Sequence, residues 1–277
     1  MERIKYPKCP SVYANIHLLN KRIRDRINYF SKAHDEKKLS VRDLEKFILF
    51  VEKNLKYFRG SWLYDNGKFF VSFLPLKRKI IHPKLTKNYN LRILKRARIY
   101  WLKIEKYSEK CYKNKTKVKL SMKGGYYSYN GFKDDEKYFI NLNDEDYQIL
   151  KDVCLKDKSI ENRFYAMLAI HYWKDKRAVL RCFYNIFKYP NPWDLNNVGY
   201  FLLPLSFKAK INFKYIWKLI NSEHQAPITK GLYILNKNLD AYKIFLKKRI
   251  YYEKIMELSK WKTPLIKYNS KLILKHI

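Results

Sequence analysis

The sequence predicts an α+β fold, in which a ferredoxin-like split βαβ unit with a long basic β-hairpin precedes a mostly α-helical extension. Apolar and polar residues alternate in several segments before residue 124, as in half-buried strands. Apolar residues recur at helical spacing in 40–56 and again after residue 125. We therefore divide the chain into an N-terminal extension (1–21), a basic domain (22–124) and a mostly helical extension (125–277).

The basic domain opens with a strand and a helix. Residues 22–29 alternate between charged and apolar side chains, which predicts an edge strand whose cationic face includes Arg24 and Arg26. Ser40 has the position of an N-cap, and apolar residues follow it at helical spacing. The sequence therefore predicts a helix over 40–56 that packs on the sheet.

A long hairpin then follows, with strands predicted at 68–74 and 89–102 and the basic segment 77–87 at its tip. The second strand is predicted from apolar residues that alternate with arginines. A short helix at 105–116 and a closing strand at 117–122 complete the predicted order of strand, helix, two strands, helix and strand.

The charge of the chain indicates a polyanionic partner. The net charge is +35 in 277 residues, and the stretch 66–104 carries eleven Lys and Arg without one Asp or Glu. The 17% content of aromatic residues excludes a disordered basic tail. Tyr100 shares the predicted arginine face and is the best candidate for stacking on bases. The predicted RNA-binding residues are Arg24, Arg26, Arg59, Lys77, Arg78, Lys79, Lys84, Lys87, Arg92, Lys95, Arg96, Arg98 and Tyr100.

The extension after residue 125 reads as a series of helices. One is predicted between 143 and 154, capped by Asn143 or Asp144. The others are predicted at 160–187, 206–220 and 239–258.

The sequence predicts neither an enzyme nor a cofactor or metal site. The six histidines and four cysteines lack metal-ligand spacing, and no glycine-rich phosphate loop is present. The acids at 144–146 would suit a metal-dependent nuclease, but a helix N-terminus favours carboxylates in any case. No run of about 18 apolar residues occurs, so we expect no membrane span and no membrane partner.

Residues of the basic domain resemble the ribosomal small-subunit protein S-ten family. The sequence SKAHD at 31–35 resembles the family's L-K-A-F-D turn, and Arg59-Gly60 ends the predicted helix as in the family. YNLR at 89–92 resembles Y-E-I-R, and VKLSM at 118–122 resembles the closing V-Q-I-S-L strand. The resemblance implies that 22–124 is an RNA-binding domain.

The resemblance further implies a structural constituent of the small ribosomal subunit, bound to the 3′ domain of the rRNA in the subunit head. It implies neighbouring head proteins (in the family, proteins three, nine and fourteen) as partners and no free homo-oligomer. Lys, Tyr, Ile, Phe and Asn are frequent while Gly and Pro number 7 and 9, a bias typical of AT-rich organelle genomes, so we expect a mitochondrial (matrix) ribosome. The alternatives are an organelle-encoded nucleic-acid-processing enzyme and a peripheral subunit of a respiratory assembly on an anionic membrane.

Overall fold

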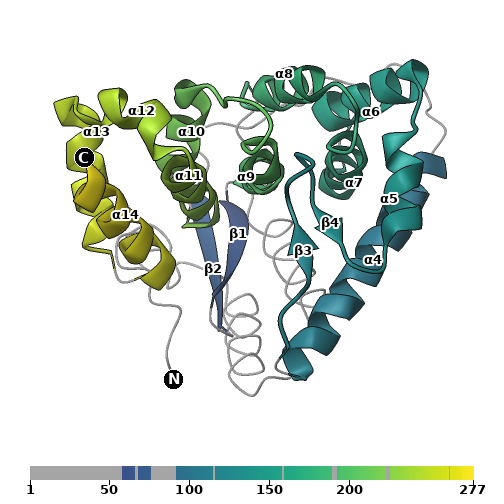
Figure 1. Ribbon diagram of the computed structural model, residues 1–277, viewed down its shortest axis with the longest axis horizontal. Coiled ribbons are helices and arrows are strands. Elements are labelled where there is room, and N and C mark those ends of the chain that lie inside the picture. The colour runs from purple at the N-terminus through teal and green to yellow at the C-terminus, as the bar shows by residue number, and fades with distance from the viewer. Residues whose placement is uncertain are drawn as a thin grey trace. The chain divides into compact units, whose positions relative to one another are not determined.

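The computed structural model describes residues 58–65, 68–75, 92–114, 116–157, 159–188, 192–222, 225–261 and 263–277 (Figure 1). In this part of the chain the fold is mostly helical, with eleven helices and two separate two-stranded antiparallel sheets. The predicted α+β, ferredoxin-like fold with a long hairpin is therefore wrong. The chain forms two compact units, one of 1–79, 191–196 and 216–277 and one of 80–190 and 197–215.

The first unit combines a β-hairpin with helices from the C-terminal part of the chain. Strands β1 (Phe58–Asp65) and β2 (Lys68–Pro75) pair antiparallel, and their register closes at Asp65 opposite Lys68. In the sequence, the dipeptide Asn-Gly, which favours two-residue hairpin loops, lies between the two strands. The helices are α11 (Gln225–Lys237), α12 (Leu239–Leu246), α13 (Arg249–Ser259), α14 (Pro264–His276) and the last turns of α10 (Phe213–Ile220).

Helix α11 is the centre of this unit, because it packs on β1, on α12 and on α14. Its buried residues Ile228, Leu232 and Leu235 meet a core to which α14 contributes Ile266 and Ile273. Such a helix needs apolar residues at three- and four-residue spacing, and the sequence of α11 supplies them.

The second unit is built on one long helix, α4 (Arg92–Lys113). A short β-ribbon of β3 (Leu120–Ser121) and β4 (Ser128–Tyr129) follows it. The remaining helices are α5 (Lys133–Ile140), α6 (Asp144–Lys156), α7 (Ile160–Ile170), α8 (Lys176–Ile186) and the later part of α9 (Pro192–Leu205). Helix α7 packs on both α4 and α6, and α6 packs on α8.

Side-chain caps fix where three of these helices begin. The Asn143 side chain accepts from the Asp146 N–H at 2.8 Å while the Asp146 carboxylate accepts from the Asn143 N–H at 3.4 Å, which is a complete capping box. This confirms the predicted Asn143 cap. Ser159 caps α7 and Asp175 caps α8 by the same kind of bond.

The largest correction concerns the predicted second hairpin strand at 89–102, since residues from Arg92 onward form α4. The predicted helix at 105–116 is the continuation of the same helix. Ile93, Leu94, Ala97, Tyr100 and Ile104 are buried, and their spacing of one, three or four residues is helical. Arg, Lys, Leu and Ala are also strong helix formers, so local preference and burial agree.

Other predicted elements exist in altered form. The strand at 68–74 corresponds to β2, but its partner is β1. Of the closing strand at 117–122 only Leu120–Ser121 pairs, and both residues are exposed. Because both residues of β3 are exposed, the alternation over 117–122 did not indicate a strand with one buried face.

The predicted helices of the extension are mostly shorter than expected. The helix at 160–187 is two helices, α7 and α8, and the helix at 239–258 is likewise α12 and α13. Of the helix predicted at 206–220 only Phe213–Ile220 is helical. The predicted strand at 22–29, the helix at 40–56 and the segment 77–87 lie outside the described residues.

Candidate nucleic-acid interface

Helix α4 exposes an almost purely cationic surface. Among its side chains that the structure describes, eight are exposed; seven of them are Lys or Arg and the eighth is Ile99. Six of the cations lie within an arc of about 100° on a helical wheel, because they follow one another at three- and four-residue steps or sit side by side. We call this set the α4 stripe; it consists of Arg92, Lys95, Arg96, Lys103, Lys106 and Lys110.

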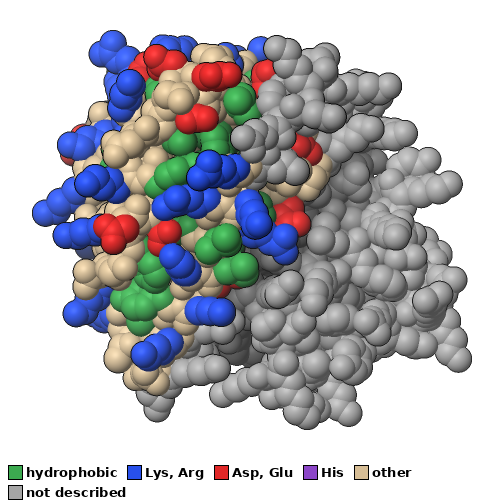
Figure 2. Space-filling model, turned by 90° about the vertical axis from the view of Figure 1, so that its right-hand side faces the viewer, with side chains coloured by type: hydrophobic (Ala, Val, Ile, Leu, Met, Phe, Trp, Pro, Cys, Tyr) green, Lys and Arg blue, Asp and Glu red, His purple; other side chains and the backbone are tan. Residues whose placement is uncertain are grey.

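The stripe extends along most of the helix. From Arg92 to Lys110 the rise is roughly 27 Å at about 1.5 Å per residue. The first turn of α4 holds no acidic residue, and Glu105 lies on a different side of the helix, where its carboxylate accepts a 2.8 Å hydrogen bond from the Trp101 indole. Figure 2 shows the side of the molecule on which α4 and α5 lie, where Lys and Arg outnumber Asp and Glu over the described part.

Some of these cations already have partners. Lys103 forms a 2.8 Å ion pair with Asp135 of α5, and the Arg96 guanidinium carbon lies 3.9 Å from the centroid of the Tyr138 ring. Lys95, Lys106 and Lys110 pair with no acidic group among the described residues. These three ammonium groups are therefore the most available to an external anion.

Arg98 is exposed but lies outside the stripe. Its guanidinium is 3.8 Å from the Glu161 carboxylate of α7, and both side chains are more than half exposed. Such a pair is worth at most about 1 kcal/mol in water. Arg98 is therefore a cation of α4 that lies on a different side of the helix from the stripe.

A buried carboxylate holds the opposite face of α4 in place. Glu136 of α5 is 4% exposed and accepts hydrogen bonds from the Tyr129 N–H at 2.7 Å, the Ser128 hydroxyl at 2.8 Å and the Tyr100 hydroxyl at 3.3 Å. The Tyr100 hydroxyl also meets the Tyr172 hydroxyl at 2.7 Å. One acidic group therefore links α4, β4 and α5, and its full hydrogen bonding makes its burial tolerable.

Packed aromatic rings surround this link. The Tyr100 ring lies 5.6 Å from that of Phe139 and 6.1 Å from that of Tyr172, centroid to centroid. Burial raises the pKa of Tyr100 and of Tyr172 above the ordinary value. Both phenols are therefore neutral and serve as hydrogen-bonding core residues.

His171 is a second buried titratable group of this unit. Its Nε2 accepts from the Tyr127 N–H at 3.3 Å, so the ring proton is on Nδ1, which donates to the Leu168 carbonyl. Burial lowers its pKa well below 6.5. With both nitrogens engaged inside the core, His171 is a structural group and is not available as a metal ligand or a general base.

Lys176 lies at the edge of the same core. Its ammonium donates to the His171 carbonyl at 3.0 Å and lies 5.0 Å from the Tyr126 ring centroid. Burial lowers its pKa to about 8. No carboxylate among the described residues lies beside it to act as a general acid or base partner.

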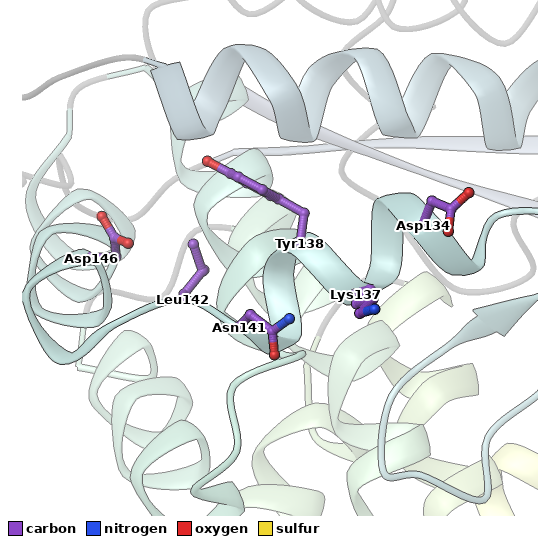
Figure 3. Close-up of a pocket in the computed structure, with 6 residues that line it drawn as sticks. All are labelled: Asp134, Lys137, Tyr138, Asn141, Leu142 and Asp146. Carbon is purple, nitrogen blue, oxygen red and sulfur yellow. The ribbon is translucent and has the colours of Figure 1, made fainter.

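A shallow depression of about 390 Å³ opens next to the stripe (Figure 3). It is lined by Asp134, Lys137, Tyr138, Asn141, Leu142 and Asp146. In Figure 3 Tyr138 reaches from α5 towards α4, where Arg96 covers its ring. Asp146 belongs to the α6 capping box, so the acids at 144–146 have the helix-terminal role expected for them.

The described residues contain no group of three or more His, Cys, Asp or Glu side chains placed to hold a metal ion. Cys111, Cys154 and Cys182 are buried free thiols. In the described part of the chain, no helix has the length and apolar character needed to cross a membrane.

The structure brings together only part of the predicted RNA-binding set. Arg92, Lys95 and Arg96 are exposed on the stripe, and Arg98 is exposed beside it. Tyr100 is fully buried, so its predicted stacking on bases is wrong. Arg59 lies in β1, whose side chains are not described, and seven residues lie outside the described ranges: Arg24, Arg26, Lys77, Arg78, Lys79, Lys84 and Lys87.

Three stripe residues were not predicted: Lys103, Lys106 and Lys110. Their signal is present in the sequence, because they continue the three- and four-residue steps that begin at Arg92. Because the predicted strand ended at residue 102, these three lysines did not belong to the predicted cationic face. Comparisons of the chain with protein families, with curated proteins and with solved structures found no match.

Proposed function

We propose that this protein is a non-enzymatic RNA-binding constituent of a ribonucleoprotein particle, and that the α4 stripe contacts RNA phosphates. The observation that carries the proposal is the exposed surface of α4, on which seven of eight described side chains are cationic. A net charge of +35 favours a polyanionic partner, which would offset the self-repulsion of the chain. Lys and Arg supply most contacts between proteins and phosphates.

The particle we propose is the small subunit of a mitochondrial ribosome. The composition of the chain, which combines a strong Lys excess with a residue bias typical of AT-rich genomes, supports the mitochondrial ribosome. The choice of the small subunit is supported by the resemblance of SKAHD at 31–35 and of Arg59-Gly60 to the S-ten family. The proposal does not rest on the S-ten fold, because the part of the S-ten resemblance from Arg92 onward lies in a helix. We therefore propose no S-ten position within the subunit.

The role proposed for the protein is to neutralise the charge of RNA phosphates. Cations held in fixed positions on a packed helix displace counterions from RNA, which makes binding strongly dependent on salt. The described residues offer a rigid scaffold for this role, since Glu136 and Tyr100 fix the buried side of α4.

Sedimentation of the tagged protein from a mitochondrial lysate tests this proposal. We expect the protein to migrate with small ribosomal subunits at low salt, and to be released by ribonuclease or by high salt. Migration at the top of the gradient, or with membranes after ribonuclease treatment, would contradict it. Cleavage of RNA by the purified protein in Mg²⁺ or Mn²⁺ would instead favour a nucleic-acid-processing enzyme.

A further inference from the structure

The side chains of the α4 stripe indicate which kind of RNA it binds. This inference rests on the proposed RNA-binding function. The stripe carries no exposed aromatic ring, because Tyr100 is buried and Trp101 and Tyr107 are half-buried. Trp101 packs on Phe164 and Tyr107 packs on Phe132. Proteins that bind single strands without sequence preference use exposed aromatic rings on which bases stack. Among the α4 side chains that the structure describes, that feature is lacking.

The stripe also lacks groups that read base edges. Its side chains are four lysines and two arginines, with no hydrogen-bond acceptor among them. Arg96, whose guanidinium could contact a base, is held over the Tyr138 ring. Contacts to phosphates position a protein on a nucleic acid without specifying sequence. The stripe is therefore suited to the backbone of an RNA of any sequence.

The stripe has two cationic ends and an apolar middle. Arg92, Lys95 and Arg96 form one end and Lys103, Lys106 and Lys110 the other, and Ile99 lies between them with 47% of its surface exposed. The rise from Arg96 to Lys103 is roughly 10 Å. Two separated groups of cations match two separated rows of phosphates with a less charged surface between them.

A helical RNA presents this arrangement across its minor groove. The minor groove of A-form RNA is wide and shallow, is bordered by the phosphates of the two strands and displays sugar hydroxyls and base edges. A rigid row of cations about 27 Å long also fits a stiff duplex better than a flexible strand, which loses conformational freedom on binding.

We infer that α4 lies across the minor groove of double-stranded RNA, with one cationic end on each phosphate row and Ile99 over the groove. Binding is then governed by the shape of the helix and is independent of base sequence. The partner segment is a duplex region of an RNA, and an unpaired loop is excluded as the preferred ligand of this helix.

Fluorescence anisotropy with the full-length protein tests the inference, with four labelled probes: a 20-base-pair RNA duplex, a duplex of scrambled sequence, the corresponding DNA duplex and oligo(U) of equal length. We expect the two RNA duplexes to bind within about twofold of each other, and at least about tenfold more tightly than oligo(U) or DNA. Equal or tighter binding of oligo(U) or DNA would overturn the duplex inference while leaving the RNA-binding function in place.

A triple variant assigns this binding to the stripe. Lys95→Gln/Lys106→Gln/Lys110→Gln should reduce the slope of log K against log salt by roughly 2.7 on the RNA duplex, because each phosphate left without its lysine removes roughly 0.9 from the slope. The matched control is Lys243→Gln/Lys247→Gln/Lys248→Gln, which removes the same charge from exposed positions of α12 and the turn after it. Equal reductions in both triple variants would show that the stripe is not the duplex site. Absence of RNA binding by the unaltered protein would overturn the proposed function itself.

Discussion

At the scale of single residues, the second unit depends on a few buried polar groups that are completely hydrogen-bonded. Glu136 receives three hydrogen bonds from β4 and α4, and His171 uses both ring nitrogens. Sequence alone did not distinguish these groups from solvated ones: the acids at 134–136 carry no local sign of burial, and Tyr100 was predicted to stack on bases. Each group has one partner that lies far away in the chain: Tyr100 and Glu136 are 36 residues apart, and Tyr127 and His171 are 44 residues apart.

Glu136→Gln should destabilise the protein. The amide oxygen can replace Oε1, which accepts from the Tyr129 N–H and the Tyr100 hydroxyl, but the NH₂ group replaces Oε2, so the Ser128 hydroxyl must change from donor to acceptor. The hydrogen bonds also lose their charged partner, and hydrogen bonds to charged groups contribute about 1.5–3 kcal/mol against about 0.5–1.5 kcal/mol for neutral ones. We expect a lower urea midpoint with an unchanged slope. Asp134→Asn, an exposed acid on the same helix, is the control and should shift the midpoint little. Equal midpoints for Glu136→Gln and the unaltered protein would contradict the role given to this carboxylate.

His171 predicts a loss of stability in mild acid. Its pKa is lowered by burial in the folded protein, so below the ordinary value of 6.5 the unfolded chain binds a proton that the folded chain does not. The stability it confers is therefore complete above pH 6.5 and decreases as the pH falls, by up to about 1.4 kcal/mol per pH unit.

Urea unfolding between pH 7 and pH 5 measures this effect before most carboxylates titrate. In His171→Gln the side-chain oxygen can still accept from the Tyr127 N–H. The slope of the free energy of unfolding against pH should be smaller than in the unaltered protein, by an amount that corresponds to the binding of nearly one proton. Identical slopes for the two proteins would mean that His171 is protonated in the folded state.

At the scale of elements, α6 was predictable and α4 was not. The Asn143 cap is a local signal, since both of its hydrogen bonds join residues three apart. In 89–102, apolar residues match both a period of two and a period of 3.6, because arginines occupy 92, 96 and 98. Lys95 breaks the alternation, whereas Leu94 and Tyr100 fit only the helical pattern of burial. Over the whole of 92–113 the apolar residues keep a helical spacing, which favours a helix. A helix of that length also places Lys103, Lys106 and Lys110 on the cationic surface.

Gly231 of α11 marks a close approach between helices. A Cβ added there would lie 2.8 Å from Cγ1 of Ile220 and 3.1 Å from the Ile220 backbone nitrogen. Alanine is better than glycine inside a helix by up to about 1 kcal/mol, but overpacking costs about 1–3 kcal/mol. Gly231→Ala should therefore reduce the free energy of unfolding by roughly 1 kcal/mol, measured by urea titration. A rise in stability would show that α10 and α11 separate without cost.

At the scale of the whole molecule, the charge and the core oppose each other. Sixty Lys and Arg repel one another around cores rich in buried aromatic rings. Bound RNA or added salt relieves this repulsion. The cations that lower the stability of the free protein are therefore the groups that we propose to bind RNA in the assembled particle. Net charge was readable from composition. The direction in which each cation points depends on the fold, and for that reason the sequence predicted an RNA partner without defining the stripe.

The buried lysines and tyrosines predict a stability maximum in moderately alkaline solution. Burial lowers the pKa of Lys176 and of Lys230 to about 8, so above pH 8 the unfolded chain binds more protons than the folded one and stability rises. Burial raises the pKa of Tyr129 to about 12 and also raises that of Tyr127 and Tyr200. Above pH 10 the folded chain therefore retains protons that the unfolded chain releases, and stability falls.

Chemical unfolding at intervals from pH 7 to pH 11.5 tests this profile, with tyrosinate absorption recorded in parallel. We expect the free energy of unfolding to rise from pH 8 to about pH 10 and then to decrease steeply, because several phenols act together. Lys176→Met should raise stability at pH 7 and flatten the rising limb, since it removes the cost of burying a charge. Tyr129→Phe should make the falling limb less steep. A continuous decline from pH 8, or a tyrosinate titration of the folded protein near pH 10 that is unchanged in Tyr129→Phe except for the loss of one ordinary tyrosine, would contradict the burial of these groups.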